Sequence, residues 1–233
     1  MIEFLHNRLF LIALTFIVFL GSQWLQKRLK VVLLNPILLS IILLIGYLVL
    51  FDIDYPTYHA AGDYIEFWLK PAVVALGVPL YRQLETIKKQ LLPILMAELA
   101  GCIVGIVSVV VTAELLGATR DVVISLAPKA VTTPIAIEIS QSLGGITPLT
   151  AAVVVCTGIF GNLAGFSIAR LSRVNSPIAS GLSVGTASHA VGTAAAMNRS
   201  QRWGAFSSLG LTLNGLFTAL LTPPLLELLG YTP

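Results

Sequence analysis

Apolar runs long enough to cross a bilayer follow one another along almost the whole chain. Of its 233 residues, 56% are hydrophobic and 11% are charged. A soluble domain carries about 25% charged residues, which help to form the polar shell around its core. This chain has too few polar residues for such a shell, so lipid must cover much of its surface. We therefore predict an all-α, polytopic membrane protein, because helices satisfy their own backbone hydrogen bonds in lipid.

About eight apolar elements are expected, within a single integral membrane domain that covers residues 1–233. A spanning helix needs about 20 mostly apolar residues. Two segments, 121–142 and 177–197, are apolar but interrupted, the first by prolines, a lysine and threonines, the second by glycines, serines and threonines. We expect these two to be broken or re-entrant. The others are expected to span the bilayer as helices at 9–26, 31–51, 66–81, 91–116, 148–171 and 204–229.

The basic residues indicate an orientation. Lysine and arginine cluster at 27–30 and again at 82–89, whereas the segment 52–66 holds four acids and no lysine or arginine. By the positive-inside rule, the two clusters face the cytoplasm and the acidic segment faces outward. The later arginines leave two arrangements open. Either both interrupted segments cross fully, or each enters and returns from opposite sides, as in an inverted repeat.

The first interrupted segment contains Lys129, followed by Thr132, Thr133 and Pro134. Pro134 suits the first position of a helix, with Thr133 as its N-cap. The free N–H groups and the positive end of such a half-helix stabilise an anion, and Lys129 adds a cation. We predict that this segment binds a carboxylate. The alternative is a proline kink with a lysine that extends toward the interface.

The second interrupted segment is expected to close the other side of the site. It contributes Ser183, Gly185, Thr186 and His189. A serine or threonine hydroxyl here would cap a second half-helix, and His189 would donate to a substrate or carry a proton. A histidine that is simply hydrogen-bonded to a neighbouring helix fits the sequence equally well. The glycines of this segment are spaced for close helix packing.

Two carboxyl side chains, Glu98 and Glu138, lie inside apolar segments. Such a group can stay protonated, pair with a cation or relay protons. Glu138 follows Pro134 by about one helical turn, and it is favoured as the partner of Lys129. Proton coupling through either glutamate is a further hypothesis. For Glu98 the alternative is a structural bond to a neighbouring helix.

Other classes of function find no support in the sequence. It contains no nucleotide-binding glycine loop, no cluster of metal ligands and no hydrolytic triad, so we predict neither an enzyme nor a bound cofactor or metal. Cys102 and Cys156 lie in apolar segments and are interpreted as packing residues. The net charge of +3 arises from short clusters between apolar runs. That pattern is typical of membrane topology rather than of a nucleic-acid surface.

Several motifs resemble the LrgB/CidB family, including its bacterial YohK branch. The most distinctive is Lys129-Ala-Val-Thr-Thr-Pro-Ile-Ala-Ile-Glu-Ile-Ser140, and a second is Gly185-Thr-Ala-Ser-His-Ala. The likeness extends over nearly the whole chain and implies a protein of the bacterial cytoplasmic (inner) membrane.

The resemblance implies two kinds of function. Bacterial members are described as holin- or antiholin-like regulators of murein hydrolase export and cell lysis, which work with a small membrane partner, LrgA or CidA. A plant relative is a plastid glycolate/glycerate transporter, and some bacterial members are linked to pyruvate uptake. Carboxylate transport agrees with the anion site predicted at Lys129 and Pro134.

We therefore expect a secondary transporter of small monocarboxylates such as glycolate, glycerate or pyruvate. The substrate would bind between the two interrupted segments. The alternative is a holin- or antiholin-like regulator of lysis with an LrgA/CidA-type partner. Faces of small residues also suggest a homodimer, whereas no nucleic-acid partner is expected.

Overall fold

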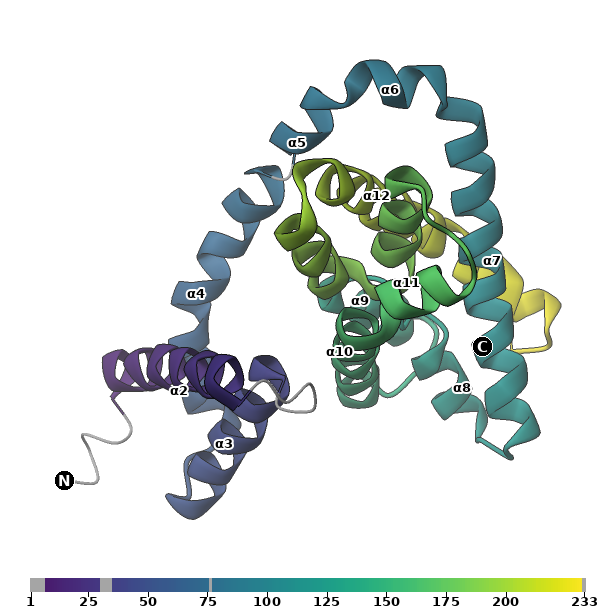
Figure 1. Cartoon of the computed structure of the whole chain (residues 1–233). Helices are drawn as coiled ribbons and strands as arrows, with labels where there is room; N and C mark the ends of the chain where they lie inside the picture. Colours follow the sequence, from purple (N-terminus) through teal and green to yellow (C-terminus); the bar gives the residue numbers. More distant parts are fainter. Residues whose placement is uncertain (1–6, 30–34, 76, 232–233) are drawn as a thin grey trace. The chain divides into compact units, whose positions relative to one another are not determined.

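The structure is a computed structural model that describes residues 7–29, 35–75 and 77–231. Within these ranges the regular elements are all α-helices (Figure 1). The chain divides into two compact units, Met1–Ala75 and Leu76–Pro233. The first helices pack among themselves, and those from residue 77 onward form a separate core. The single integral membrane domain expected from the sequence stays a prediction.

The first unit contains α2 (Arg8–Leu29), α3 (Pro36–Leu50) and α4 (Tyr55–Ala75), and α2 packs against both of the others. Asn35 begins α3, because its side-chain oxygen accepts hydrogen bonds from the backbone N–H groups of Ile37 and Leu38. Proline follows at the first helical position, where a missing N–H costs nothing. This cap explains why α3 begins at Pro36. The earlier part of the expected 31–51 span, residues 31–34, lies outside the described residues.

The second unit is built around α12, which packs most extensively against α11 and also contacts α7, α9 and α5 (Figure 1). α10 lies against α11, α9 and α8. The helices of this unit are α5 (Gly77–Arg82), α6 (Leu84–Lys89), α7 (Leu91–Leu115), α8 (Arg120–Leu126), α9 (Thr133–Ser142), α10 (Thr147–Leu171), α11 (Pro177–Arg199) and α12 (Gln201–Leu228).

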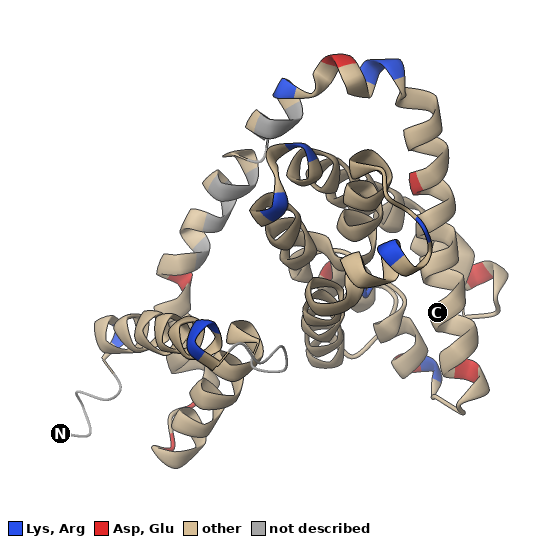
Figure 2. Cartoon of the chain, viewed as in Figure 1, with Lys and Arg blue, Asp and Glu red and all other residues tan. Residues whose placement is uncertain are grey.

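Four of the described helices, α2, α7, α10 and α12, are long and apolar enough to cross a membrane. The shorter α3 is also apolar. Charged residues gather at helix ends and connections (Figure 2), and α10 and α11 carry almost none. The chain is therefore a helical membrane protein by length and composition. Eight membrane elements and an inverted repeat remain predictions.

The expected span at 66–81 overlaps two elements. Its first part falls on α4, which ends at Ala75, and its second part falls on α5, which begins at Gly77. These two helices belong to different compact units. A spanning helix at 66–81 stays a prediction.

Glycines let the backbones of α11 and α12 touch. A methyl group added at Gly181 would lie 2.7 Å from the carbonyl oxygen of Trp203, and one at Gly185 would collide with the backbone of Ser207. A methyl group at Gly210 would in turn lie 2.5 Å from the carbonyl oxygen of Leu182. Small residues at four-residue spacing permit such close approach in membranes. The spacing of Gly181 and Gly185 is thus explained by packing.

We expect Gly185→Ala to weaken the contact between α11 and α12. Overpacking of this kind typically costs about 1–3 kcal/mol, so the melting temperature of the purified protein in detergent should fall. Gly21→Ala is the matched control, because nothing lies within 4 Å of the added methyl group and alanine favours a helix more than glycine does. Equal loss in both variants would contradict the close contact.

Candidate functional site

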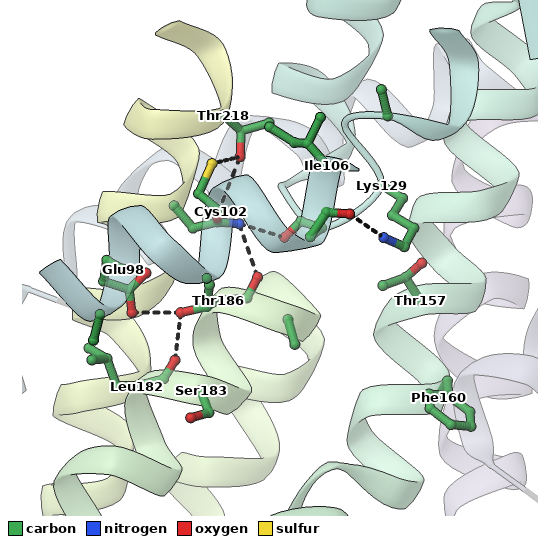
Figure 3. A pocket seen from close by; sticks show the side chains of 17 residues that line it. Glu98, Cys102, Ile106, Lys129, Thr157, Phe160, Leu182, Ser183, Thr186 and Thr218 are labelled. Atoms are coloured by element: carbon green, nitrogen blue, oxygen red, sulfur yellow. Dashed lines mark hydrogen bonds between the residues drawn. The ribbon is translucent and has the colours of Figure 1, made fainter. Parts of the chain in front are cut away.

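A cavity of about 400 Å³ lies within the second unit. Its wall is formed by α7, the segment between α8 and α9, α10, α11 and α12 (Figure 3). Most of the lining is apolar or formed by small residues. The side chains that bring polar groups to it are Glu98, Lys129, Thr157, Ser183, Thr186, Asn214 and Thr218.

Lys129 is held between two short helices. Because α8 ends at Leu126 and α9 begins at Thr133, Lys129 belongs to the connecting segment. Its Nζ donates to the carbonyl oxygen of Gly105 on α7 at 3.2 Å. An ammonium group has three donors, and this bond uses one. Lys129 therefore places a cation in the cavity wall with capacity for a further hydrogen-bond acceptor.

Glu138 is not the partner of Lys129, and this expectation was wrong. The ion pairs between described residues include neither side chain, and Glu138 is exposed and does not line the cavity. The buried face of α9 is formed by Ala136, Ile139 and Ser140. Glu138 lies on the opposite face, which the spacing from Pro134 alone did not reveal.

Thr132, Thr133 and Pro134 lie at the start of α9, outside the cavity lining. The helix begins one residue earlier than predicted, at Thr133, with Thr132 as its N-cap. The Thr132 side chain makes no capping hydrogen bond. Pro134 fits this position because the N–H groups of a first helical turn have no partner within the helix. The predicted carboxylate-binding group is therefore divided, with Lys129 in the cavity wall and the other three residues beyond it.

The second interrupted segment is one helix, α11, with a kink at His189, whose φ is 42° and ψ is −139°. A positive φ is unfavourable for a residue with a side chain. The imidazole Nε2 lies 2.9 Å from the carbonyl oxygen of Val154 on α10, and the side chain is 4% exposed and outside the cavity lining. His189 thus adopts the alternative that the sequence left open, a histidine bonded to a neighbouring helix.

Ser183 and Thr186 line the cavity, whereas Gly185 faces α12. Each of the two hydroxyls contacts a backbone oxygen and caps no N–H group among the described residues. Ser183 donates to the carbonyl oxygen of Ala179, and Thr186 contacts that of Leu182, each one turn earlier in the same helix. Side chains that bond backward in this way stay beside the helix interior and cannot reach the N–H groups beyond the kink.

Glu98 is 1% exposed and also lines the cavity. Its Oε1 lies 2.6 Å from the Thr186 hydroxyl of α11. Its Oε2 is buried without a hydrogen-bond partner among the described residues. Figure 3 shows Glu98 and Thr186 together in one part of the view, with Lys129 beside Thr157 in another. The cavity thus contains one acidic and one basic side chain, which form no ion pair with each other.

Asn214 of α12 joins the two interrupted segments, and the sequence reasoning missed it. Its Nδ2 donates to the carbonyl oxygen of Ala130, between α8 and α9, at 3.2 Å, and to that of Thr186 at 3.0 Å. Thr186 precedes the kink at His189 by three residues. One amide therefore satisfies backbone oxygens at both interruptions. The signal was present in the sequence, because Asn214 is a lone amide in an apolar span and such residues often bridge helices.

Comparison with known proteins agrees with the membrane fold. The profile of the LrgB-like family matches residues 15–228, which is most of the chain. The chain belongs to the LrgB-like family. This confirms the resemblance drawn from the Lys129–Ser140 block and the Gly185 motif.

Curated relatives of this LrgB-family chain cover nearly all of it. A protein of Staphylococcus epidermidis strain RP62A named "Holin-like protein CidB" is 35% identical over 94% of this chain and 95% of its own length. A protein of the same name from Staphylococcus aureus strain Mu50 is 35% identical over 94% and 96%. "Uncharacterized protein YxaC" of Bacillus subtilis is 36% identical over 87% and 88%. No solved structure matches the chain significantly.

We expect Asn214→Ala to destabilise the second unit. The substitution leaves two part-buried carbonyl oxygens without their donor, at a cost of about 1–3 kcal/mol. The measurement is the melting temperature of the purified protein in detergent. Asn198→Ala is the matched control, because Asn198 is exposed near the end of α11. A melting temperature unchanged by Asn214→Ala would show that the two interruptions do not depend on this amide.

Proposed function

We propose that this chain is a holin-like membrane protein that acts on the permeability of the bilayer containing it. Two relatives with this name are 35% identical to it over 94% of its length. That similarity supports the holin- or antiholin-like alternative more strongly than it supports the monocarboxylate transporter favoured from the sequence. The four long apolar helices are consistent with a membrane location.

The proposal extends to location and partners. The lysines and arginines at 27–30 and 82–89 favour the bacterial cytoplasmic membrane, with both clusters on the inner side. A small membrane protein of the LrgA/CidA type is the proposed partner. The chain acts by changing permeability or by regulating export, without catalysing a reaction.

A second candidate function is transport of a small monocarboxylate, and the cavity is the observation that favours it. Lys129 provides a cation there, with the hydroxyls of Thr157 and Ser183 in the same lining. A simple lysis pore does not require an ammonium group in the wall of a cavity, whereas a lysine inside a membrane protein is costly and usually functional. The two functions differ in selectivity. A holin-like pore passes unrelated solutes, whereas a carrier saturates and distinguishes related ones.

Reconstitution into liposomes separates the two functions. We expect the holin-like chain to release an entrapped neutral sugar and an entrapped dye, with a steep dependence on the protein-to-lipid ratio. Uptake of labelled glycolate and pyruvate should then show no saturation. Lys129→Ala should leave the release unchanged, because a pore does not bind its solute at one cation.

The opposite outcome is equally specific. Saturable uptake without sugar release, reduced about tenfold or more by Lys129→Ala through loss of a charge-assisted hydrogen bond, would reject the pore and establish the carrier. Lys89→Ala is the matched control, since Lys89 is exposed at the end of α6. If the liposomes show no release and no uptake, both functions are rejected for the chain acting without a partner.

A further inference from the structure

The Thr186 hydroxyl lies between two oxygen atoms that compete for its single hydrogen. Its Oγ1 is 2.8 Å from the carbonyl oxygen of Leu182 and 2.6 Å from Oε1 of Glu98. A hydroxyl donates one hydrogen bond, and a carbonyl oxygen only accepts. With Thr186 as the donor in both contacts, the one hydrogen is shared between two acceptors, whereas each short contact has a hydrogen of its own if Glu98 is protonated. The carboxyl then donates to Thr186, and Thr186 donates to Leu182.

The protonated form also suits the other carboxyl oxygen. Oε2 of Glu98 has no hydrogen-bond partner among the described residues, and the side chain is 1% exposed. In a neutral carboxyl, an oxygen without a partner is only a weak acceptor that makes no hydrogen bond. In a carboxylate, the same oxygen shares a full charge, whose burial without hydrogen bonds is far more costly. An ionised Glu98 would also compete with Leu182 for the Thr186 hydrogen.

The titratable groups around Glu98 come from each element of the cavity wall. Lys129 shares the cavity from the α8–α9 segment. His189 of α11 is turned toward Val154 of α10, and Cys102 is one turn along α7. Of the described residues that line the cavity, Lys129 is the one with a basic side chain. Charged or titratable groups elsewhere on the elements that pack against α7 or line the cavity are Glu85, Lys88, Lys89, Glu114, Arg120, Asp121, Cys156, Arg170, Arg199, Arg202 and Glu227.

Thr186 connects this carboxyl to the kinked helix. Its side chain contacts Glu98, and its backbone oxygen accepts the hydrogen bond from Asn214. Three residues later, His189 holds the unfavourable positive φ at which α11 changes direction. A change in the hydrogen bonding of the Thr186 hydroxyl thus takes place within one helical turn of the kink, on a helix that forms part of the cavity wall.

We infer that Glu98 is a proton-binding site, and that its protonation sets the hydrogen bonding of Thr186 and thereby the first half of α11 beside the cavity. The inference rests on the proposed function in one respect: permeability of the bilayer should depend on pH through this residue. The ligand of the site is the proton itself.

Infrared difference spectroscopy of the full chain in liposomes tests proton binding without any transport readout. Wild-type protein should show the carbonyl stretch of a protonated carboxyl, which is lost as the pH rises. Glu98→Gln should lack this band at every pH, and Glu227→Gln, a change at an exposed glutamate near the end of α12, should retain it. Thr186→Val should move the band to higher frequency by removing the hydrogen bond, and Thr186→Ser should restore it.

The permeability arm uses the solute release or uptake of the same liposomes at acidic and basic pH. Wild-type rates should differ between the two conditions. In Glu98→Gln, which resembles the protonated form, the ratio of the two rates should fall to about one. A band that persists in Glu98→Gln, a band that disappears in Glu138→Gln instead, or a rate ratio unchanged by Glu98→Gln would each overturn the inference. If wild-type liposomes pass no solute, the proposed function fails and the infrared bands alone decide proton binding.

Discussion

The two hydrogen bonds donated by Asn214 link the interrupted segments of the second unit. Broken helices persist at membrane depth only where other groups satisfy the freed backbone oxygens. Ala130 lies in one interruption and Thr186 directly precedes the other, and a single side chain of α12 reaches both. The two interruptions are therefore linked through one side chain, and residues of both segments line the cavity.

Close packing places that amide and also shapes the cavity. Gly181 and Gly185 bring α11 against α12, and Gly158 on α10 leaves space for the His189 ring. Bulkier residues at these positions would push the helices apart and separate Asn214 from its acceptors. The small residues thus set the distance between the helix backbones, while the polar residues of the lining determine the chemistry of the cavity wall.

Family membership and cavity chemistry point to complementary aspects of function. The relatives named holin-like carry the proposal of an effect on membrane permeability. The ammonium of Lys129 and the carboxyl of Glu98 give the cavity wall a chemistry that a simple pore does not need. The holin-like proposal and the proton-binding inference are compatible. A proton at Glu98 would change the hydrogen bonding of Thr186 in the cavity wall, and this change requires no selective substrate.

Sequence alone determined the class of fold and the family. The scarcity of charge requires lipid and helices, and the blocks at 129–140 and 185–190 carry the LrgB resemblance. It also identified Lys129, Glu98, Ser183 and Thr186, because a polar group in an apolar run is informative in itself. Only the tertiary structure decided which of them meet. Glu138 lies on the exposed face of α9. His189 is hydrogen-bonded to a carbonyl oxygen of α10, and Asn214 bonds to both interrupted segments. Such pairings depend on contacts between distant helices, which local spacing cannot encode.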